Sequence, residues 1–489
     1  MNGLTVRVPF PPAILITLVL TTLLMYAAFA IAPHEVRMAL LVCGGLMVAV
    51  VAFTSVELTL YLLILSTLLS PELTFGAQTT AHGVVTSTTE SRGITLRLDD
   101  LLLTVICITW MFRMAVSKEL GAVRKTPINQ PILWYWLWTV LATVAGFYAG
   151  RVGMFGLFFV LKYLEYFVLF YMIINQVHDE AAIKRYLMVL LFTCFVVSLV
   201  GIAQIPSGER VSAPFEGEEG EPNTFGGYLV LMFGVTLGIF LDEPEGTRRW
   251  RWAALMGVIL APLAFTESRS SYLAFVAMIG LFILLSEHKR FLLGCCMAGL
   301  AVMPFVLPPN VVNRVMYTFA QPEEAGQIKL GGVHIDTSTS ERLRSWEIVL
   351  TNDVPKHPII GFGVTGSRFM DAQYPRVLSE TGAVGLILFI WLLRRIWVLL
   401  RLCHRRLRDP LIRGAALGTL CGYGGLLFHA LGSNTFIIVR IMEPLMILLG
   451  LLLAALLIEE EREAAGAMAS GQASEDGHPD RLSGVEATA

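Results

Sequence analysis

Long apolar runs recur throughout this 489-residue chain, and they limit its fold more than any other feature. Most of the runs approach the roughly 20 residues that an α-helix needs to cross the hydrocarbon core of a bilayer. A chain inside a bilayer must satisfy its backbone hydrogen bonds internally, so each run is predicted to form a helix. The sequence therefore predicts an all-α polytopic integral membrane protein with about 12–14 transmembrane helices.

The composition excludes a water-soluble core. Hydrophobic residues make up 55% of the chain and charged residues 15%, and the mean hydropathy is +0.67. A soluble domain has about a quarter of its residues charged. The predicted spans lie near residues 12–31, 37–54, 56–70, 100–116, 131–149, 154–175, 184–204, 223–241, 252–266, 271–286, 291–306, 377–399, 414–430 and 436–457.

Two details near the N-terminus leave alternatives. Residues 12–31 resemble a signal peptide that ends at an Ala-Phe-Ala sequence, but their full membrane length favours an uncleaved first span. The run 56–70 is short, and the connection 71–98 has no basic cluster, so the number of spans between 56 and 98 is open.

Lysine and arginine residues predict the orientation of the helices. Basic clusters fall on alternate connections between spans, and such clusters normally stay on the cytoplasmic side. Both termini are then cytoplasmic, and the segment 307–376 lies outside. The clusters are Arg113/Lys118/Arg124/Lys125, Lys184/Arg185, Arg248/Arg249/Arg251, Lys289/Arg290 and the basic residues from Arg394 to Arg413.

These predictions divide the chain into four parts. Residues 1–306 form a transmembrane bundle of about eleven spans. Residues 307–376 form one large external loop, and residues 377–457 form the three C-terminal spans. Residues 458–489 are rich in Glu, Ala, Gly and Ser, so we expect a disordered cytoplasmic tail.

The sequence also argues against several function classes. It has no phosphate-binding loop of the Walker type, no dinucleotide-binding fingerprint and no serine nucleophile elbow. Of its seven cysteines, six lie in apolar spans, and no Cys or His spacing suits zinc, so we expect no disulfide, metal or cofactor. The net charge is -2, and the basic clusters indicate topology and anionic lipid, not nucleic acid.

Several charged residues lie inside or beside the predicted spans, where they are costly and often functional. Lys162 and Glu165 form one pair with i,i+3 spacing, and Arg440 and Glu443 form another. Each pair either braces two helices as a self-neutralising pair or lines a cavity. Arg269 lies where the chain turns outside between two spans. Because these charges all belong to the outer half of the membrane, we expect one externally open cavity.

The polar segment 307–376 interrupts the apolar pattern, and loops of this kind usually carry function. Within it, Ser340 to Val349 is predicted to form a helix with one apolar stripe, lying along the membrane surface. Arg342 flanks the stripe and should face protein or lipid headgroups, whereas Arg344 should face water. Arg342 either snorkels to lipid phosphate or binds a pyrophosphate. The stripe consists of Leu343, Trp346, Val349 and Leu350.

Four segments occur in one order around this loop. They are Glu221-Pro-Asn-Thr-Phe-Gly-Gly-Tyr-Leu, Thr266-Glu-Ser-Arg-Ser-Ser-Tyr-Leu, Arg342-Leu-Arg-Ser-Trp with His357-Pro-Ile-Ile-Gly-Phe-Gly, and Asp371-Ala-Gln-Tyr-Pro-Arg-Val-Leu-Ser-Glu-Thr-Gly-Ala-Val-Gly. Their order and spacing resemble the family of O-antigen ligases and of O-antigen and exopolysaccharide polymerases, over roughly residues 200–450. The resemblance implies a membrane glycosyltransferase with a GT-C-like bundle.

The resemblance also implies a substrate and a location. Such enzymes use a sugar chain carried on undecaprenyl pyrophosphate in the bacterial inner membrane, with the active site facing the periplasm. The family's two functional arginines correspond to Arg269 and Arg342, which are thought to hold the pyrophosphate. Ligases of the family typically have a His-Asn pair where this chain has Asp371-Ala372. This difference favours the polymerases, in which an Asp is often found there.

Glycosyl transfer requires a group that accepts the proton of the attacking hydroxyl and positive charge that stabilises the leaving group. Two arginines on a pyrophosphate supply that charge without a metal. Asp371 is the preferred base, and Glu380 is the alternative. Glu380 also has a structural interpretation, an ion pair with Arg376 at i,i+4 spacing or with Arg269. Tyr374 either stacks under a sugar ring or anchors the membrane boundary.

We therefore expect polymerisation of lipid-linked oligosaccharide repeat units into exopolysaccharide or O-antigen at the outer face of the inner membrane. A ligase would share the cavity and transfer the chain to lipid A core or another acceptor. A transporter or flippase should show matching charges in the inner half and repeat symmetry, and we see neither. Expected partners are the lipid-linked oligosaccharide, membrane lipid, and a flippase and chain-length regulator of the same pathway. The expected substrate-binding residues are Arg269, Arg342, Tyr374, Arg376, Lys162, Arg440 and Asn223.

Overall fold

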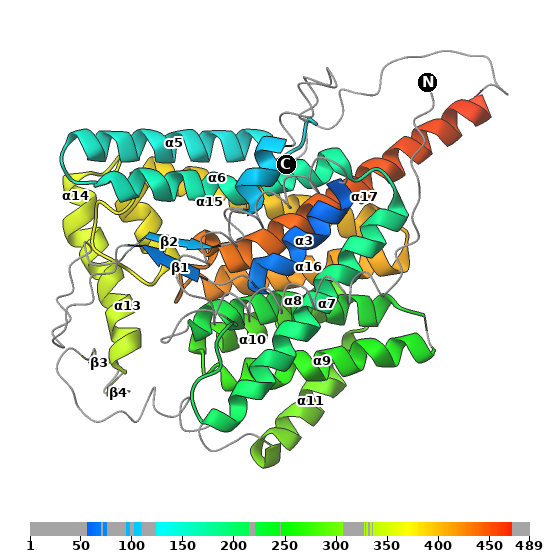
Figure 1. Cartoon of the computed structure of the whole chain (residues 1–489). Helices are drawn as coiled ribbons and strands as arrows, with labels where there is room; N and C mark the ends of the chain where they lie inside the picture. Colours follow the sequence, from blue (N-terminus) through cyan, green and yellow to red (C-terminus); the bar gives the residue numbers. More distant parts are fainter. Residues whose placement is uncertain are drawn as a thin grey trace, which may run out of the picture.

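Helices dominate the structure, as the apolar runs predict (Figure 1). The computed structural model describes residues 56–69, 72–75, 94–97, 102–109, 124–214, 221–244, 246–306, 327, 329–330, 333–334 and 336–471. In these residues, seven helices are long and apolar enough to cross a membrane, which confirms an all-α polytopic membrane protein. They are α5 (Asn129–Tyr148), α6 (Met154–Gln176), α7 (Glu180–Gln204), α8 (Pro222–Asp242), α15 (Gln373–Arg406), α16 (Pro410–His429) and α17 (Val439–Gly471).

Shorter helices fall on other predicted spans. A helix over residues 102–109 lies within the predicted span 100–116. The predicted spans 12–31 and 37–54 lie outside the described residues. The remaining helices at predicted spans are α3 (Val56–Leu69), α9 (Thr247–Phe265), α10 (Arg269–Leu285) and α11 (Lys289–Val306).

Two small pairs of antiparallel strands are not part of the prediction. β1 (Glu72–Phe75) pairs with β2 (Ile94–Arg97), and β3 (Lys329–Leu330) pairs with β4 (Val333–His334). Both pairs lie in connections between the apolar runs, so they leave the helical bundle unchanged.

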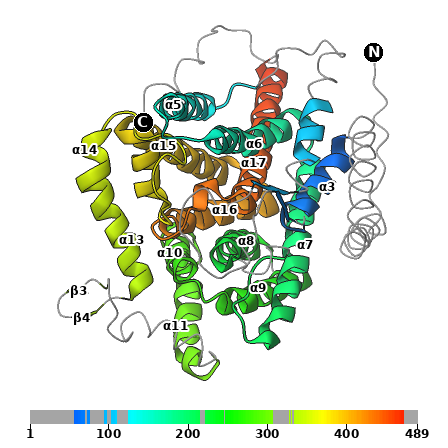
Figure 2. The same cartoon turned by 60° about the vertical axis from the view of Figure 1, so that its left-hand side comes forward.

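The centre of the bundle is the close contact of α8 with α16, which lie side by side in Figures 1 and 2. Glycines spaced four residues apart on α16, namely Gly414, Gly418 and Gly422, face the backbone of α8. A Cβ built on Gly418 would collide with the carbonyl oxygen of Gly234 on α8. Small residues at this spacing let two membrane helices approach closely.

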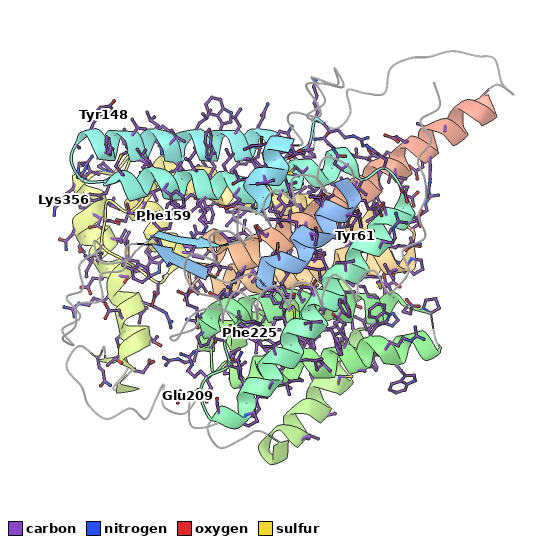
Figure 3. All side chains as sticks on the ribbon, viewed as in Figure 1. Tyr61, Tyr148, Phe159, Glu209, Phe225 and Lys356 are labelled. Atoms are coloured by element: carbon purple, nitrogen blue, oxygen red, sulfur yellow. The ribbon has the colours of Figure 1, made fainter. Side chains whose placement is uncertain are left out.

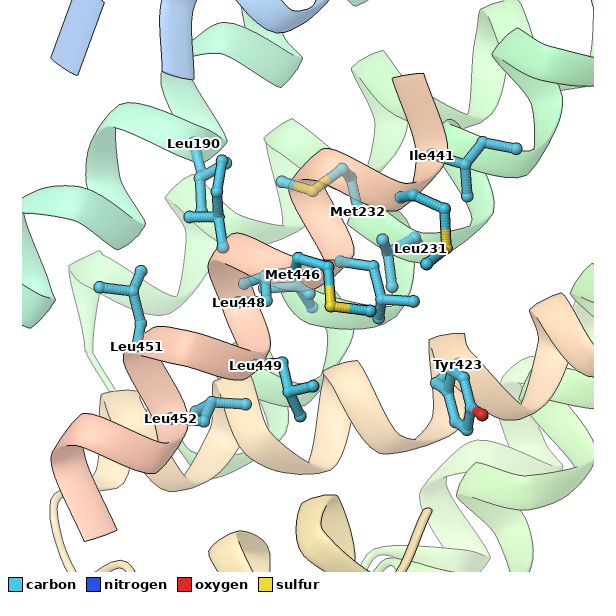
Figure 4. Close-up of a cluster of buried hydrophobic side chains, with 14 of the residues drawn as sticks. Leu190, Leu231, Met232, Tyr423, Ile441, Met446, Leu448, Leu449, Leu451 and Leu452 are labelled. Atoms are coloured by element: carbon cyan, nitrogen blue, oxygen red, sulfur yellow. The ribbon is translucent and has the colours of Figure 1, made fainter. Parts of the chain in front are cut away.

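Apolar side chains fill the space around this helix pair. Figure 4 shows Leu190 of α7, Leu231 of α8 and Met446 of α17 in one buried cluster. The outer helices instead expose large apolar side chains: Leu133 of α5 and Val276 of α10 are 50% and 69% exposed. A helix that presents apolar side chains outward is suited to lipid.

Two aromatic side chains illustrate this contrast between the outer helices and the core. Figure 3 shows Tyr148 at the end of α5 pointing away from the bundle, and Phe225 within α8. Tyr148 is exposed and Phe225 is fully buried.

At the C-terminal end of the described chain, α17 continues to Gly471, beyond the end of the predicted span at 457. Residues 458–471, which we expect to belong to a disordered tail, are therefore helical. Residues 472–489 lie outside the described part.

The large polar loop returns to the bundle through three consecutive short helices. These are α13 (Thr337–Ile348), the π-helix η3 (Val349–Asp353) and α14 (Val354–Lys356). α13 confirms the helix that the sequence predicts between Ser340 and Val349. Figure 2 shows α13 at the edge of the bundle, next to α10.

α15 is broken at Gly382, where the loop fastens onto it. Gly382 has a φ of 68° and a ψ of −173°, a conformation that essentially only glycine adopts. The amides of Phe362 and Gly363 donate hydrogen bonds of 3.0 and 2.8 Å to the carbonyl oxygens of Ser379 and Glu380, just before the break. The Ala383 amide after the break donates to the loop at 2.9 Å. A broken helix is tolerated here because the loop satisfies its backbone groups.

Candidate functional site

The N-terminus of α10 carries Arg269, the first predicted arginine. Ser268 caps the helix, because its Oγ accepts a hydrogen bond from the Ser271 amide at 3.3 Å. Glu267, just before the cap, has a φ of 49°, and the chain turns sharply there after α9. Arg269 is therefore the first residue of α10, at the positive end of the helix dipole.

Arg269 forms an ion pair with Asp336, the residue just before α13. Arg269 Nη1 lies 2.6 Å from Asp336 Oδ2, and the two side chains are 18% and 2% exposed. Asp336 Oδ2 also accepts a hydrogen bond from the Thr339 amide at 3.3 Å. Burial alone would raise the pKa of Asp336, but the bonds from Thr339 and Arg269 outweigh burial and hold the pKa below its ordinary value. Asp336 thus stays an anion beside Arg269, a contact that the sequence does not predict.

Arg342 lies half-buried on α13, on the side that faces the bundle, as predicted. Arg344, in contrast, is exposed. A Cβ built on Gly432, in the segment after α16, would lie 2.5 Å from Ser270 Oγ and 3.6 Å from Arg342 Nε. The absence of a side chain at Gly432 therefore lets the start of α10 and the α13 arginine approach one point. Arg342 therefore lies close to Ser270, the residue that follows Arg269 on α10.

The predicted apolar stripe of α13 does not share one environment. Val349 is fully buried, but Leu343 and Leu350 are 39% and 54% exposed. The buried positions of α13 are instead serines, Ser340 and Ser345. The hydroxyl of Ser345 is satisfied within the helix, because it donates to the Glu341 carbonyl oxygen at 2.9 Å.

A chain of hydrogen-bonded side chains lies beside the arginines. Ser268 Oγ donates to Asn223 Oδ1 at 2.6 Å, and Ser271 Oγ donates to Ser268 Oγ at 2.8 Å. Ser271 Oγ also lies 3.2 Å from Nε2 of His429, the last residue of α16. Nδ1 of His429 lies 2.8 Å from Thr435 Oγ1, in the short helix η4 (Thr435–Ile437). The chain thereby joins α8, α10, α16 and η4.

Two glycines of α8 make room for this chain. A Cβ built on Gly226 would collide with the side chain of Ser271, and one built on Gly227 would lie 3.1 Å from Cε1 of His429. Both glycines belong to the segment that begins at Glu221. The first two of the four family-like segments are therefore in direct contact, and they meet at His429.

Asp371, the predicted base, is an exposed residue two positions before α15. The residue before it is fixed to the segment that contacts Arg342, since Asn434 Nδ2 donates to the Met370 carbonyl oxygen at 2.7 Å. Asp371 thus directly follows a residue that is bonded to the segment between α16 and η4, which also contains Gly432. Its assignment as the base stays a prediction.

Glu380 is held in an ion pair with Arg376, one turn earlier on α15. Arg376 Nε lies 3.0 Å from Glu380 Oε1, and both side chains are largely buried. The same Oε1 accepts a hydrogen bond from the Thr365 amide at 3.2 Å. The i,i+4 ion pair that the sequence offers for Glu380 is therefore present. Because this carboxylate braces the loop against α15, Asp371 is the stronger candidate for the base.

The hydroxyl of Tyr374 is also occupied. It donates to the Leu427 carbonyl oxygen of α16 at 2.8 Å, and the Tyr374 ring packs against the apolar core. This arrangement favours the anchoring role of Tyr374. Stacking of its ring under a sugar stays a prediction.

The two intramembrane charge pairs lie on other helices. Lys162 and Glu165 are half-buried on α6, and Arg440 and Glu443 are fully buried on α17. Arg440 Nη1 donates to the Pro214 carbonyl oxygen at 3.0 Å, so it braces the chain that leads towards α8. Contact of Lys162 or Arg440 with a substrate stays a prediction.

A third arginine, Arg210, reaches the turn between α9 and α10. Its Nε donates to the Thr266 carbonyl oxygen at 3.1 Å, and its Nη2 donates to that of Glu267 at 3.4 Å. Sequence reasoning misses this residue because it lies 56 residues before its partner, in a connection without a motif.

Together these residues make a region suited to an anion. It contains the guanidinium groups of Arg269 and Arg342, the N-terminus of a 17-residue helix and several hydroxyl groups, with an exposed carboxylate nearby along the chain. In the part of the chain that the structure describes, no group of three or more His, Cys, Asp or Glu side chains is arranged to hold a metal ion.

Residues 253–390 match a family model described as O-antigen ligase. The matched residues run from α9 into α15 and include Arg269, Arg342, Asp371 and Glu380. A search of curated proteins found no match. The family match confirms the resemblance for this part of the chain, which carries both predicted arginines.

Proposed function

We propose that this protein is a membrane glycosyltransferase that polymerises undecaprenyl-pyrophosphate-linked oligosaccharide repeat units into exopolysaccharide or O-antigen. The reaction takes place at the outer face of the bacterial inner membrane, and no metal takes part in the transfer. One observation carries the proposal: Arg269 of α10 and Arg342 of α13 both lie within the residues that match the O-antigen ligase model, and Gly432 borders both Arg342 and Ser270, the residue next to Arg269.

The arginines bind the pyrophosphate of the lipid that carries the growing chain. A planar guanidinium presents paired donors to phosphate oxygens, and two of them neutralise the charge that develops as the glycosidic bond breaks. The contact between Arg269 and Asp336 supports this assignment, because an anionic oxygen already occupies the position beside the guanidinium. The N-terminus of α10 adds its dipole to the same position.

The acceptor is a sugar hydroxyl of the incoming lipid-linked repeat unit. Its oxygen attacks the anomeric carbon of the growing chain, its proton passes to the Asp371 carboxylate, and the bond from the anomeric carbon to the pyrophosphate oxygen breaks. The bonding electrons leave with the pyrophosphate, which Arg269 and Arg342 stabilise. The exposure of Asp371 supports its role, because a large acceptor must reach the base.

Replacement of either arginine tests the proposal. We expect Arg269→Ala and Arg342→Ala each to lower polymer synthesis by about 100-fold or more, the usual effect of removing a group that stabilises charge in the transition state. Asp371→Asn should have an effect of similar size. The measurement is polymer length and yield from purified lipid-linked repeat units and the purified protein in lipid nanodiscs.

Arg344→Ala is the matched control, because Arg344 lies on the same helix as Arg342 but is exposed. It should leave polymer synthesis unchanged. Normal chain length in Arg269→Ala or Arg342→Ala would show that the arginines do not bind the pyrophosphate. Equal losses in Arg344→Ala and Asp371→Asn would show that the loop acts through folding alone.

A ligase is the second candidate, because the matching family model is described as O-antigen ligase. Asp371-Ala372, where ligases of the family typically have a His-Asn pair, supports the polymerase. The same purified system separates the two. A polymerase extends lipid-linked repeat units on their own, whereas a ligase transfers one chain only after lipid A core or another acceptor is added. A flippase and a chain-length regulator would be partners of the polymerase.

A further inference from the structure

His429 lies at the centre of a hydrogen-bonded chain that the proposed reaction does not use. It is fully buried at the end of α16, and its two ring nitrogens contact hydroxyl groups on different elements. The space for the imidazole depends on Gly227, and glycine is a poor residue inside a helix such as α8. A histidine that only ends a helix would not need this arrangement.

The directions of the hydrogen bonds follow from the end of the chain at Asn223. Its Oδ1 can only accept, so the Ser268 hydroxyl must donate to it. The single proton of Ser268 is then used, so Ser268 Oγ accepts from the Ser271 hydroxyl. Ser271 has likewise used its proton, and its Oγ must accept from Nε2–H of His429.

The other ring nitrogen settles the charge of His429. The imidazole is fully buried, its ring nitrogens contact hydroxyl groups, and the charged side chain that acts on it, Arg342, is itself a cation. A second proton on the ring would therefore be a buried and uncompensated charge. Nδ1 must then be unprotonated, and it accepts from the Thr435 hydroxyl at 2.8 Å, a shorter contact than the 3.3 Å from the same hydroxyl to the Ser433 carbonyl oxygen. The five side chains form one chain in which every donor points towards Asn223.

This chain fixes the side-chain amide of Asn223. Because Oδ1 is held by Ser268, the Nδ2 donors of the amide are turned away from Ser268. Asn223 is half-buried at the start of α8, and Ser268 directly precedes Arg269. The Asn223 amide is therefore held beside the residue that precedes Arg269, and its nitrogen is the half of the amide that the chain leaves for another partner.

We propose that His429 is a positioning residue: as a neutral imidazole protonated at Nε2, it orients Ser271 and Ser268 and so holds the Asn223 amide with its nitrogen donors towards the pyrophosphate of the lipid-linked chain. The identity of this ligand rests on the proposed function. His429 itself does not touch the substrate, since it is fully buried.

The tautomer of His429 is the first test, and it is independent of activity. The protein has nine histidines, so the full-length chain is labelled with ring-¹⁵N histidine in lipid nanodiscs, and the His429 signals are assigned by their absence in His429→Gln. We expect a protonated Nε2, an unprotonated Nδ1 and a shift of the Nε2 signal in Ser271→Ala. An Nδ1-protonated or doubly protonated ring would overturn the proposal.

Binding of undecaprenyl pyrophosphate to the same nanodiscs is the second test. His429→Leu should weaken binding by about tenfold or more, which corresponds to the loss of one well-placed hydrogen bond to a charged group. His429→Gln keeps an N–H group that can reach Ser271, and it should restore the affinity to within about threefold of the native protein. His404→Leu, a change of the same kind at the far end of α15, is the matched control and should bind normally.

A double-mutant cycle separates positioning from folding. If His429 acts through Asn223, then His429→Leu combined with Asn223→Ala should bind no more weakly than Asn223→Ala alone. Additive losses in the cycle, or a His429→Gln variant as weak as His429→Leu, would overturn the proposal. If the native protein does not bind undecaprenyl pyrophosphate at all, the proposed function fails, and the ¹⁵N tautomer still decides whether the relay exists.

Discussion

Single residues at this site fall into those with partners nearby in the sequence and those with distant partners. The ion pair of Arg376 and Glu380 follows from i,i+4 spacing on one helix, so the sequence predicts it. The partner of Arg269, Asp336, lies in a different segment, and the partner of His429 lies 158 residues away. Contacts of the second kind depend on how the helices pack, which hydrophobic periodicity does not encode.

Asp336→Asn tests the tie between α10 and α13. The asparagine keeps an oxygen for the Thr339 amide but removes the charge beside Arg269, so we expect a loss of about 2 kcal/mol in the free energy of unfolding near neutral pH. The folded-state pKa of Asp336 lies below its ordinary value of 3.8. Its charge therefore stabilises the protein fully above pH 3.8, and that contribution disappears as the pH falls through the folded-state value.

The measurement is thermal unfolding of the purified protein as a function of pH. The difference between native protein and Asp336→Asn should be constant above pH 4 and shrink under more acidic conditions. Glu341→Gln, which removes an exposed carboxylate from α13, is the control and should follow the native curve. A difference that grows on acidification would mean that the carboxylate is protonated in the folded state.

At the scale of elements, the sequence predicts which segments are helices but not where a helix breaks. All long helices in the described residues fall on predicted apolar runs, because length and hydropathy decide whether a segment crosses a membrane. The break in α15 depends on Gly382 and on a loop that supplies backbone partners from residues 358–363. The predicted span 377–399 runs across the break, so the position of the apolar run alone does not reveal it.

Gly382→Ala should destabilise α15 and detach the loop from it. Alanine at a φ of 68° and a ψ of −173° costs about 1–3 kcal/mol in backbone strain, and its Cβ would collide with the carbonyl oxygen of Ile359. We expect a lower unfolding temperature together with faster proteolytic cleavage between residues 357 and 371. Gly257→Ala in α9, where a Cβ meets nothing within 4 Å, should leave both unchanged.

At the scale of the whole molecule, the contact of α8 with α16 sets the positions of the other helices. α8, α10 and α17 all pack on α16, and glycines keep α8 closest to it. The sequence predicts both helices, but it does not reveal that the glycines of one face the backbone of the other. Which face of one helix packs on which face of another depends on tertiary contacts, and a single sequence does not specify them.

Gly418→Leu tests this central contact. A leucine side chain would meet the backbone of Gly234 and Val235, so we expect a loss of about 1–3 kcal/mol or more from overpacking, and displacement of α10 along with α16. Thermal unfolding in detergent measures the loss of stability. Loss of polymer synthesis reports the displacement of α10, which carries Arg269. Gly294→Leu in α11 faces open space and should be tolerated. Normal stability in Gly418→Leu would mean that the two helices separate easily.

The two arginines are attached to the molecule in unequal ways. Arg269 is part of a helix that packs into the rigid centre, whereas Arg342 is carried by a loop helix whose buried positions are serines and whose first turn is tied to α10 by one charge. Arg269 therefore belongs to the bundle, and Arg342 belongs to the loop. An anion that contacted both guanidinium groups would therefore add a second charged link between α13 and the bundle, beside the one that Asp336 makes.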